Sequence, residues 1–130
     1  MNVNKRALII TDGTEAIQSI AQTISGVLDG FTVKMCTAEK FAGTDLLASD
    51  LFFIGCEKSC PSSFVYLEDL LSHINLASRK CGVFSTKEKT LKYLRGIVKD
   101  SEADLTDPLS APKGEVKKSV LKKWIKGILK

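Results

Sequence analysis

The sequence predicts an α/β fold in which a doubly wound, parallel, five-stranded sheet lies between two layers of helices. Segments with the pattern of strands alternate with segments with the pattern of amphipathic helices, about five times along the chain. The strand segments are short continuous apolar runs, as expected for strands buried on both faces of a parallel sheet. Right-handed crossovers then favour a three-layer sandwich. A chain of 130 residues is expected to form one domain, residues 1–130.

The first half of the chain supplies three of the predicted strands. Residues 7–10 (Ala-Leu-Ile-Ile) form the first apolar run, and a helix is predicted over residues 15–29, where apolar side chains recur at steps of three and four. Residues 31–36 are predicted to form the second strand. A less regular stretch, with a short turn of helix near residues 42–47, leads into the third strand at residues 50–54. These elements would make two successive strand–helix–strand units.

The second half continues the alternation. A helix is predicted from about residue 63 to residue 75, followed by a fourth strand at residues 81–84 and a helix at residues 87–99. A short, weak fifth strand is expected near residues 103–105. The last helix is predicted over residues 115–129, where apolar positions fall on one side.

Composition excludes several classes of protein. Hydrophobic residues make up 44% of the chain and charged residues 26%, which is ordinary for a globular protein and argues against disorder. No apolar run is long enough to span a membrane. No signal-peptide pattern is recognised near the N-terminus, so a cytoplasmic protein is expected. The four cysteines are then expected to be free thiols.

Positive charge is concentrated at the C-terminal end. Residues 113–130 contain seven lysines and one glutamate, a net charge of +6, whereas the whole chain carries +4. A basic helix of this kind can attract an acidic protein partner, or it can be the last helix of the sandwich with its lysines in water. No groove-reading motif or aromatic-bearing sheet face accompanies it, so no nucleic-acid partner is expected.

Three loops that follow predicted strands carry the resemblance to a known family. The first reads Thr-Asp-Gly-Thr-Glu at residues 11–15, the second begins Gly-Cys at residues 55–56, and the third reads Ser-Thr-Lys at residues 85–87. The chain resembles the flavodoxins, whose first strand leads into a Thr- and Gly-rich loop and whose third strand often ends in Gly-Cys. The resemblance implies a flavodoxin-like sheet of order 2-1-3-4-5 and an electron-transfer protein that binds flavin mononucleotide (FMN) and has no catalytic side chain.

The resemblance also implies where FMN would lie. The first loop opens a helix, whose free backbone N–H groups favour a phosphate, while the other two loops would border the flavin ring. The implied FMN-binding residues are Thr11, Asp12, Gly13, Thr14, Glu15, Ala16, Cys56, Glu57, Lys58, Ser59, Cys60, Ser85, Thr86 and Lys87.

The sequence departs from the flavodoxin pattern in these same loops. The first loop is shorter than usual, and Asp12 stands where a neutral hydroxyl side chain is expected. A carboxylate repels a phosphate, so Asp12 or Thr14 could instead cap the first helix. The ring loops lack the large aromatic side chains that flavodoxins place there. The alternative is therefore a degenerate flavodoxin-like interaction or regulatory module that has lost FMN.

Other kinds of site find little support. Cys56 and Cys60 have the spacing Cys-x3-Cys, which is not Cys-x2-Cys and is not matched by a second cysteine pair, so incidental thiols are favoured over a metal site. Lys58 could make Cys60 the more reactive thiol. His73 lacks an evident catalytic partner. A response-regulator receiver would need an acidic residue where Gly55 ends the third strand. No dinucleotide- or triphosphate-binding glycine motif occurs. The resemblance implies a carrier or binding module more than an enzyme, since no residue argues for a flavin-dependent reductase.

Overall fold

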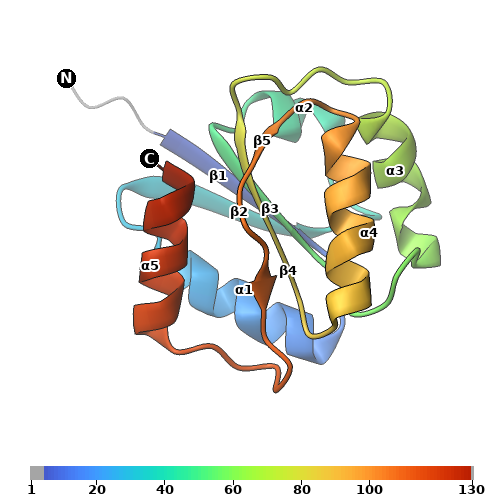
Figure 1. Ribbon diagram of the computed structural model, residues 1–130. Coiled ribbons are helices and arrows are strands. Elements are labelled where there is room, and N and C mark those ends of the chain that lie inside the picture. The colour runs from blue at the N-terminus through green and yellow to red at the C-terminus, as the bar shows by residue number, and fades with distance from the viewer. Residues whose placement is uncertain (1–4, 130) are drawn as a thin grey trace.

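The structure, a computed structural model, describes residues 5–129, in which strands alternate with helices except that two short strands follow each other before the last helix (Figure 1). The strands, in chain order, are β1 (Lys5–Thr11), β2 (Phe31–Thr37), β3 (Leu51–Gly55), β4 (Lys80–Ser85), β5 (Asp104–Leu105) and β6 (Leu109–Ser110). The helices are α1 (Glu15–Val27), α2 (Gly43–Leu47), α3 (Val65–Leu71), α4 (Glu88–Lys99) and α5 (Lys118–Leu129), with a 3-10 turn (Ser62–Phe64) ahead of α3.

All strand pairs in the sheet are parallel, and the order is β2-β1-β3-β4-β5. This confirms the predicted fold class and strand order. The register places Thr11 of β1 opposite Gly55 of β3, and Gly55 opposite Phe84 of β4. The carboxyl ends of these three strands therefore lie side by side, as the sequence-based reading of the three loops requires.

The fifth strand differs from the prediction because it is split into two short pieces. Asp104 pairs with Lys80 near the start of β4, and Leu109 of β6 pairs with Phe84 near its end. Pro108 lies between the two pieces, and a proline has no N–H to donate to the ladder. One expected strand near residues 103–105 thus becomes two, both paired with β4.

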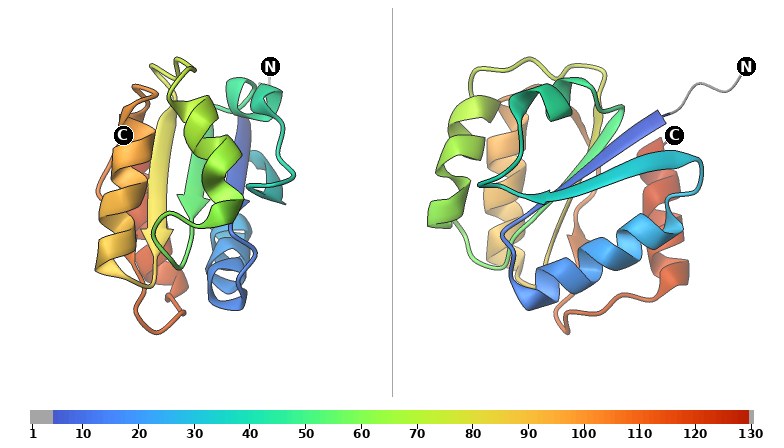
Figure 2. Two further views of the ribbon diagram at one scale, coloured as in Figure 1. Left: turned by 90° about the vertical axis from the view of Figure 1, so that its right-hand side faces the viewer. Right: turned by 180° about the vertical axis from the view of Figure 1, so that it is seen from behind.

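The helices form a layer on each face of the sheet. Helices α1 and α5 cover one face, and α2, α3 and α4 cover the other, as Figure 2 shows from the side and from behind. Each interface is a separate cluster of buried apolar side chains. The central strand β3 contributes to both, since Phe52 packs in one cluster and Phe53 in the other. This alternation is what two buried faces demand, and it explains the continuous apolar run.

The helix over 63–75 is shorter than predicted. A 3-10 turn precedes it and α3 ends at Leu71. Two short polar side chains compete with helix continuation. The Ser72 hydroxyl donates to the Asp69 carbonyl at 2.7 Å, and the Asn75 side-chain oxygen accepts the Ala77 N–H at 2.9 Å. The other helices keep their predicted places, with ends that shift by up to a turn.

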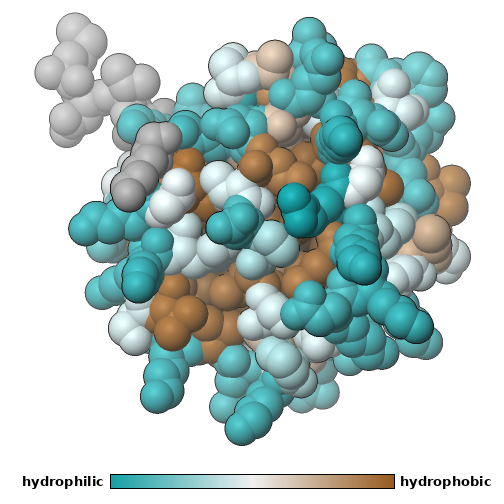
Figure 3. Space-filling view, in the orientation of Figure 1, coloured by the Kyte–Doolittle hydropathy of each residue, from teal (hydrophilic) through white to brown (hydrophobic). Residues whose placement is uncertain are grey.

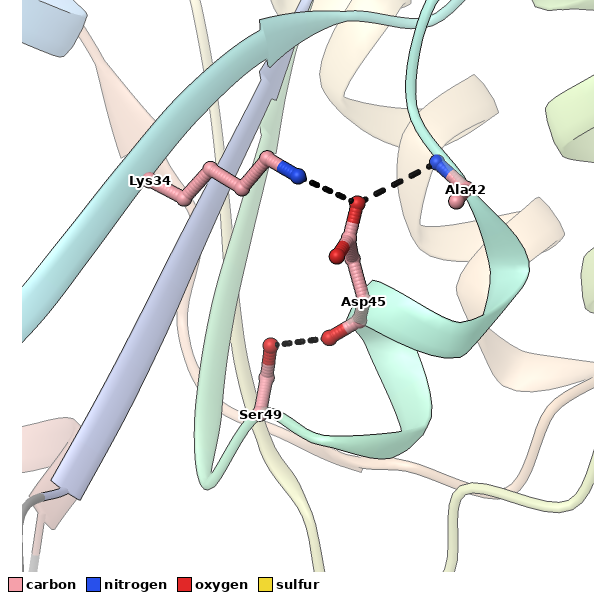
Figure 4. Close-up of polar contacts among 4 residues, drawn as sticks. All are labelled: Lys34, Ala42, Asp45 and Ser49. Carbon is pink, nitrogen blue, oxygen red and sulfur yellow. Dashed lines mark hydrogen bonds and ion pairs between the residues drawn. The ribbon is translucent and has the colours of Figure 1, made fainter.

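Helix α2 is tied to the sheet by one carboxylate (Figure 4). The Asp45 side chain accepts a hydrogen bond from Lys34 Nζ of β2 at 2.9 Å and another from the Ala42 N–H at 3.3 Å. The Ser49 hydroxyl donates to the Asp45 carbonyl at 2.6 Å. The Lys34 ammonium, followed by the Ala42 N–H, holds the pKa of Asp45 below its ordinary value. A helix of five residues, too short to be stable alone, is thereby fixed.

Candidate functional site

The three loops predicted to form the site do meet at one edge of the sheet. The residues that follow the paired strand ends are linked directly by hydrogen bonds. The Ser85 hydroxyl donates to the Cys56 carbonyl at 2.7 Å, and the Thr90 hydroxyl, from the first turns of α4, donates to the Glu57 carbonyl at 2.9 Å. The second and third loops therefore form one connected surface.

The carboxylate of Asp12 joins the first loop to the second. Its Oδ1 accepts hydrogen bonds from the Thr14 N–H at 3.0 Å and from the Thr14 hydroxyl at 2.7 Å. Its Oδ2 accepts the Glu57 N–H at 2.8 Å across 45 positions of sequence. Charge-assisted bonds of this length are the stronger kind. Asp12 thus accepts hydrogen bonds from three donors, two in the first loop and one in the second.

The rest of the first loop is also internally bonded. The Thr11 hydroxyl donates to Gln18 Oε1 at 2.6 Å and accepts the Gly13 N–H at 3.3 Å. Gly13 has a φ of +82°, a conformation that favours glycine. Thr14 stands at the N-cap of α1 with extended backbone, yet its hydroxyl makes no capping bond. The side chains of both threonines are therefore engaged within the loop and α1.

The segment between β6 and α5 adds a fourth wall at this edge. The Ala111 N–H donates to the Ser85 carbonyl at 2.9 Å, which anchors the segment beside the third loop. A Cβ placed on Gly114 would lie 3.3 Å from Cβ of Ala16, so this backbone passes close to the first turn of α1. The view in Figure 1 shows the segment running below the N-terminal end of α1.

Not all of the predicted site residues are drawn into this network. Glu15 is exposed, and the second loop leaves Lys58, Ser59 and Cys60 exposed at its tip. The Thr86 hydroxyl oxygen is enclosed and makes no hydrogen bond within the described residues. Gln18 and Thr90 belong to the network although the sequence did not single them out. Gln18 lies seven positions after Thr11, and no motif marks that pair.

The two cysteines of the second loop have different surroundings. Cys56 is buried, and its Sγ lies 3.2 Å from the Lys58 carbonyl oxygen. Burial, followed by the nearby charge of Asp12, raises the pKa of Cys56 far above its ordinary value. Cys60 is exposed and has a φ of +49°. The expectation of free thiols is met by all four cysteines.

Phe64, Tyr66 and Trp124 pack against other parts of the fold. Phe64 is fully buried in the core, and Tyr66 packs against Phe41 with ring centroids 5.3 Å apart. Trp124 of α5 packs against Phe53 of β3 at 5.5 Å. No aromatic side chain occurs in residues 57–63 or 85–92 of the sequence. The second and third loops therefore present no ring on which a flavin could stack.

The described range, residues 5–129, contains neither a cluster of metal-ligand side chains nor a membrane-spanning helix. No group of three or more histidine, cysteine or acidic side chains within this range is placed to hold a metal ion. No helix in the same part of the chain is both long enough and apolar enough to cross a membrane.

Comparison with solved structures identifies the architecture. The flavodoxin of Streptococcus pneumoniae TIGR4 superposes with a TM-score of 0.77 over 95% of this chain and 97% of that chain, at 13% sequence identity. Oxidised Flavodoxin 2 from Bacillus cereus gives 0.76 at 21% identity, over 95% and 97% of the two chains. A short-chain flavodoxin associated with a PDU bacterial microcompartment gives 0.76 at 13% identity, over 98% and 97%.

Comparison of the sequence itself finds no match. No protein-family model matches the sequence, and no curated protein matches it either. The likeness therefore lies in the three-dimensional structure: the strand order, the two helix layers and the nearly complete mutual coverage. These features show that the chain has the flavodoxin-like fold.

Proposed function

We propose that this chain is a flavodoxin-fold interaction module that docks on an acidic protein through the basic face of α5. In this proposal its loop edge does not hold the phosphate of FMN. The observation that carries the second part is the Asp12 carboxylate, which takes two donors of the first loop and one of the second. A phosphate at the start of α1 would need donors of the same kind.

Electrostatics points the same way. Two unit charges 4 Å apart repel by about 4 kcal/mol at an effective dielectric constant of 20, which corresponds to a loss of nearly a thousandfold in affinity. Asp12 is partly buried and hydrogen-bonded, so it is held at the loop instead of turning into water. The position of this carboxylate therefore supports the proposal that the first loop does not hold a phosphate dianion.

The basic face of α5 supports the docking role. Its apolar side packs in the core through Leu121, Ile125 and Ile128. The opposite side is exposed, and none of its lysines pairs with a carboxylate within the described residues. Figure 3 shows mostly hydrophilic residues on the side of the molecule where α5 lies, with apolar patches between them. The lysines of this face are Lys117, Lys118, Lys122, Lys123 and Lys126.

A second candidate is an FMN-binding electron carrier, favoured by the convergence of the three loops and by the enclosed, unpaired hydroxyl of Thr86. That function requires Asp12 to leave its three hydrogen bonds and the flavin ring to bind without stacking. The flavodoxin-like fold makes FMN a natural ligand to test.

The experiment that separates the two candidates is a visible absorption spectrum after incubation with excess FMN and desalting. We expect the unmodified protein to remain colourless and Asp12→Ser to retain more flavin, because the substitution frees the loop donors. Asp29→Ser is the matched control, since Asp29 is an exposed acid at the other end of α1. A stable flavin spectrum of the unmodified protein would refute the first proposal and establish the second.

Docking through α5 is tested with poly-L-glutamate as the acidic probe and Trp124 as the reporter. Trp124 is the sole tryptophan and lies on α5. We expect poly-L-glutamate to change the Trp124 emission in a salt-sensitive way. The affinity for poly-L-glutamate should fall by about tenfold in a Lys122→Glu/Lys123→Glu variant. A Lys87→Glu/Lys89→Glu variant removes the same charge near the start of α4. Equal affinity of the two variants would show that the α5 face is not the docking surface.

A further inference from the structure

A cavity of about 470 Å³ lies at the opposite edge of the sheet from the loops described above. It is formed where β1, β2, β3 and β4 begin and where α2 and α5 end. Figure 1 shows the start of β1 beside the last turn of α5, and the rear view in Figure 2 shows the same neighbours. Its volume is within the range of small-molecule sites, about 300–1,000 Å³.

Arg79 gives this cavity an unbalanced positive charge. Its side chain is half-buried, and Nη2 donates to the Leu47 carbonyl at 2.7 Å. Its Nε is enclosed and has no hydrogen-bond acceptor among the described residues. No carboxylate pairs with the guanidinium within residues 5–129. A partly buried guanidinium normally has an anionic partner, so this one calls for explanation.

The acidic residue of the cavity does not provide that partner. Asp50 lines the cavity, but its Oδ2 accepts the Arg6 N–H at 2.9 Å. Two lysines, Lys5 and Lys80, also line the cavity, and Lys80 lies 3.9 Å from Asp104. Cationic side chains therefore outnumber acidic ones around the cavity.

Apolar side chains form one part of the wall, beside the serines Ser49 and Ser78. Leu47 at the end of α2 is 48% exposed, and Leu129 at the end of α5 is 41% exposed. Phe31, the first residue of β2, is partly buried and belongs to the same lining. The two leucines are among the large apolar side chains that the described part of the chain leaves in water. They come from helices on opposite faces of the sheet, so the cavity is where both layers end in apolar surface.

We propose that this cavity binds a small organic carboxylate with an apolar body. The carboxylate would pair with the Arg79 guanidinium, whose planar donors match it, and the body would cover Phe31, Leu47 and Leu129. One fixed guanidinium and an apolar wall suit a single charge on a hydrophobic body better than a phosphate, which has more oxygens to satisfy. The site is independent of the loop edge and of FMN.

The test is a titration of the folded, isotope-labelled protein followed by the backbone amide signals of the lining residues. The probes are phenylacetate, its neutral analogue phenylacetamide, and inorganic phosphate. We expect saturable shifts with phenylacetate, confined to the lining residues, and at least about tenfold weaker binding of the other two. Equal binding of phenylacetamide, preference for phosphate, or shifts that fail to saturate would each overturn the proposal.

Variants assign the two halves of the site. Arg79→Gln should weaken phenylacetate binding by about tenfold or more, since it removes the charge. If Arg79→Gln fails to fold, Leu129→Glu supplies the test, because it places a negative charge on the exposed lip and should weaken binding to a similar extent. Val65→Glu is the control, since Val65 is 65% exposed on α3 and does not line the cavity. Unchanged affinity in a folded Arg79→Gln or Leu129→Glu protein would refute the assignment.

Discussion

Replacement of Asp12 by alanine tests whether one carboxylate holds two distant loops together. The substitution deletes the acceptor of three hydrogen bonds, two from Thr14 and one from the Glu57 N–H. The Thr14 bonds resemble a helix-terminus contact, worth about 1 kcal/mol. The Glu57 bond has a charged acceptor, for which about 1.5 kcal/mol is a low estimate. Together they predict a loss of about 2–3 kcal/mol of unfolding free energy.

That loss translates into a measurable fall in melting temperature. The unfolding entropy of a domain of this length is about 0.27 kcal/mol/K, so Tm should fall by roughly 9 °C. Differential scanning calorimetry measures this shift. The matched control is Asp29→Ala at the exposed end of α1, where the change should stay within about 0.5 kcal/mol.

Amide hydrogen exchange gives the same prediction local resolution. In Asp12→Ala, the N–H groups of Thr14 and Glu57 lose their acceptor and should exchange faster, whereas the amides of the central strand β3 should change only as much as global stability does. If Tm falls by less than about 2 °C and the Glu57 amide keeps its protection, the carboxylate does not hold the loops, and the argument against a phosphate at this edge loses its basis.

Three other predictions concern thiols, packing and pH. Cys60, which is exposed, should react with iodoacetamide in the native protein, whereas Cys56, which is buried and has a raised pKa, should stay unmodified. Mass spectrometry of the alkylated peptides measures the labelling of both cysteines, and equal labelling would contradict the structure. Gly82→Ala should lower the unfolding free energy by about 1–3 kcal/mol in urea titrations, because the new Cβ would lie 2.8 Å from two side chains of α5. The control is Gly26→Ala, whose new Cβ meets no atom within 4 Å, so the substitution should be neutral or stabilising. Asp45→Asn should remove part of the acid destabilisation. The pKa of Asp45 is lowered in the folded state, so the stability that Asp45 contributes is complete at pH values above its ordinary pKa and is lost as pH falls through its folded-state pKa. The urea midpoints of the two proteins should therefore converge across that acid range. A gap that stays constant with pH would contradict this prediction.

The fold was predictable because it depends on pattern. Apolar runs such as residues 51–54 must be buried on both faces, and parallel strands joined by helices then leave few arrangements. Departures from the prediction come from single residues. Pro108 splits the fifth strand by removing one N–H, and Ser72 helps to end α3 by bonding a nearby carbonyl. The ends and breaks of these elements depend on local hydrogen bonds of single residues, and the spacing of apolar residues carries no information about them.

The meeting of the three loops at one edge of the sheet was predictable, but the hydrogen bonds among them were not. Strand order brings the three loops together, and that follows from the pattern. The contact that decides their chemistry joins Asp12 to the Glu57 N–H, 45 positions away. In sequence, Asp12 was consistent with capping the first helix or with lying beside a phosphate. In the structure it is bonded to Thr14 and to the next loop at once, because the β1 and β3 ends are adjacent. A carboxylate that already satisfies these donors makes a bound phosphate unnecessary for the stability of the loop edge. The same geometry makes Asp12 the residue whose removal should most directly free the donors of this loop for an anion.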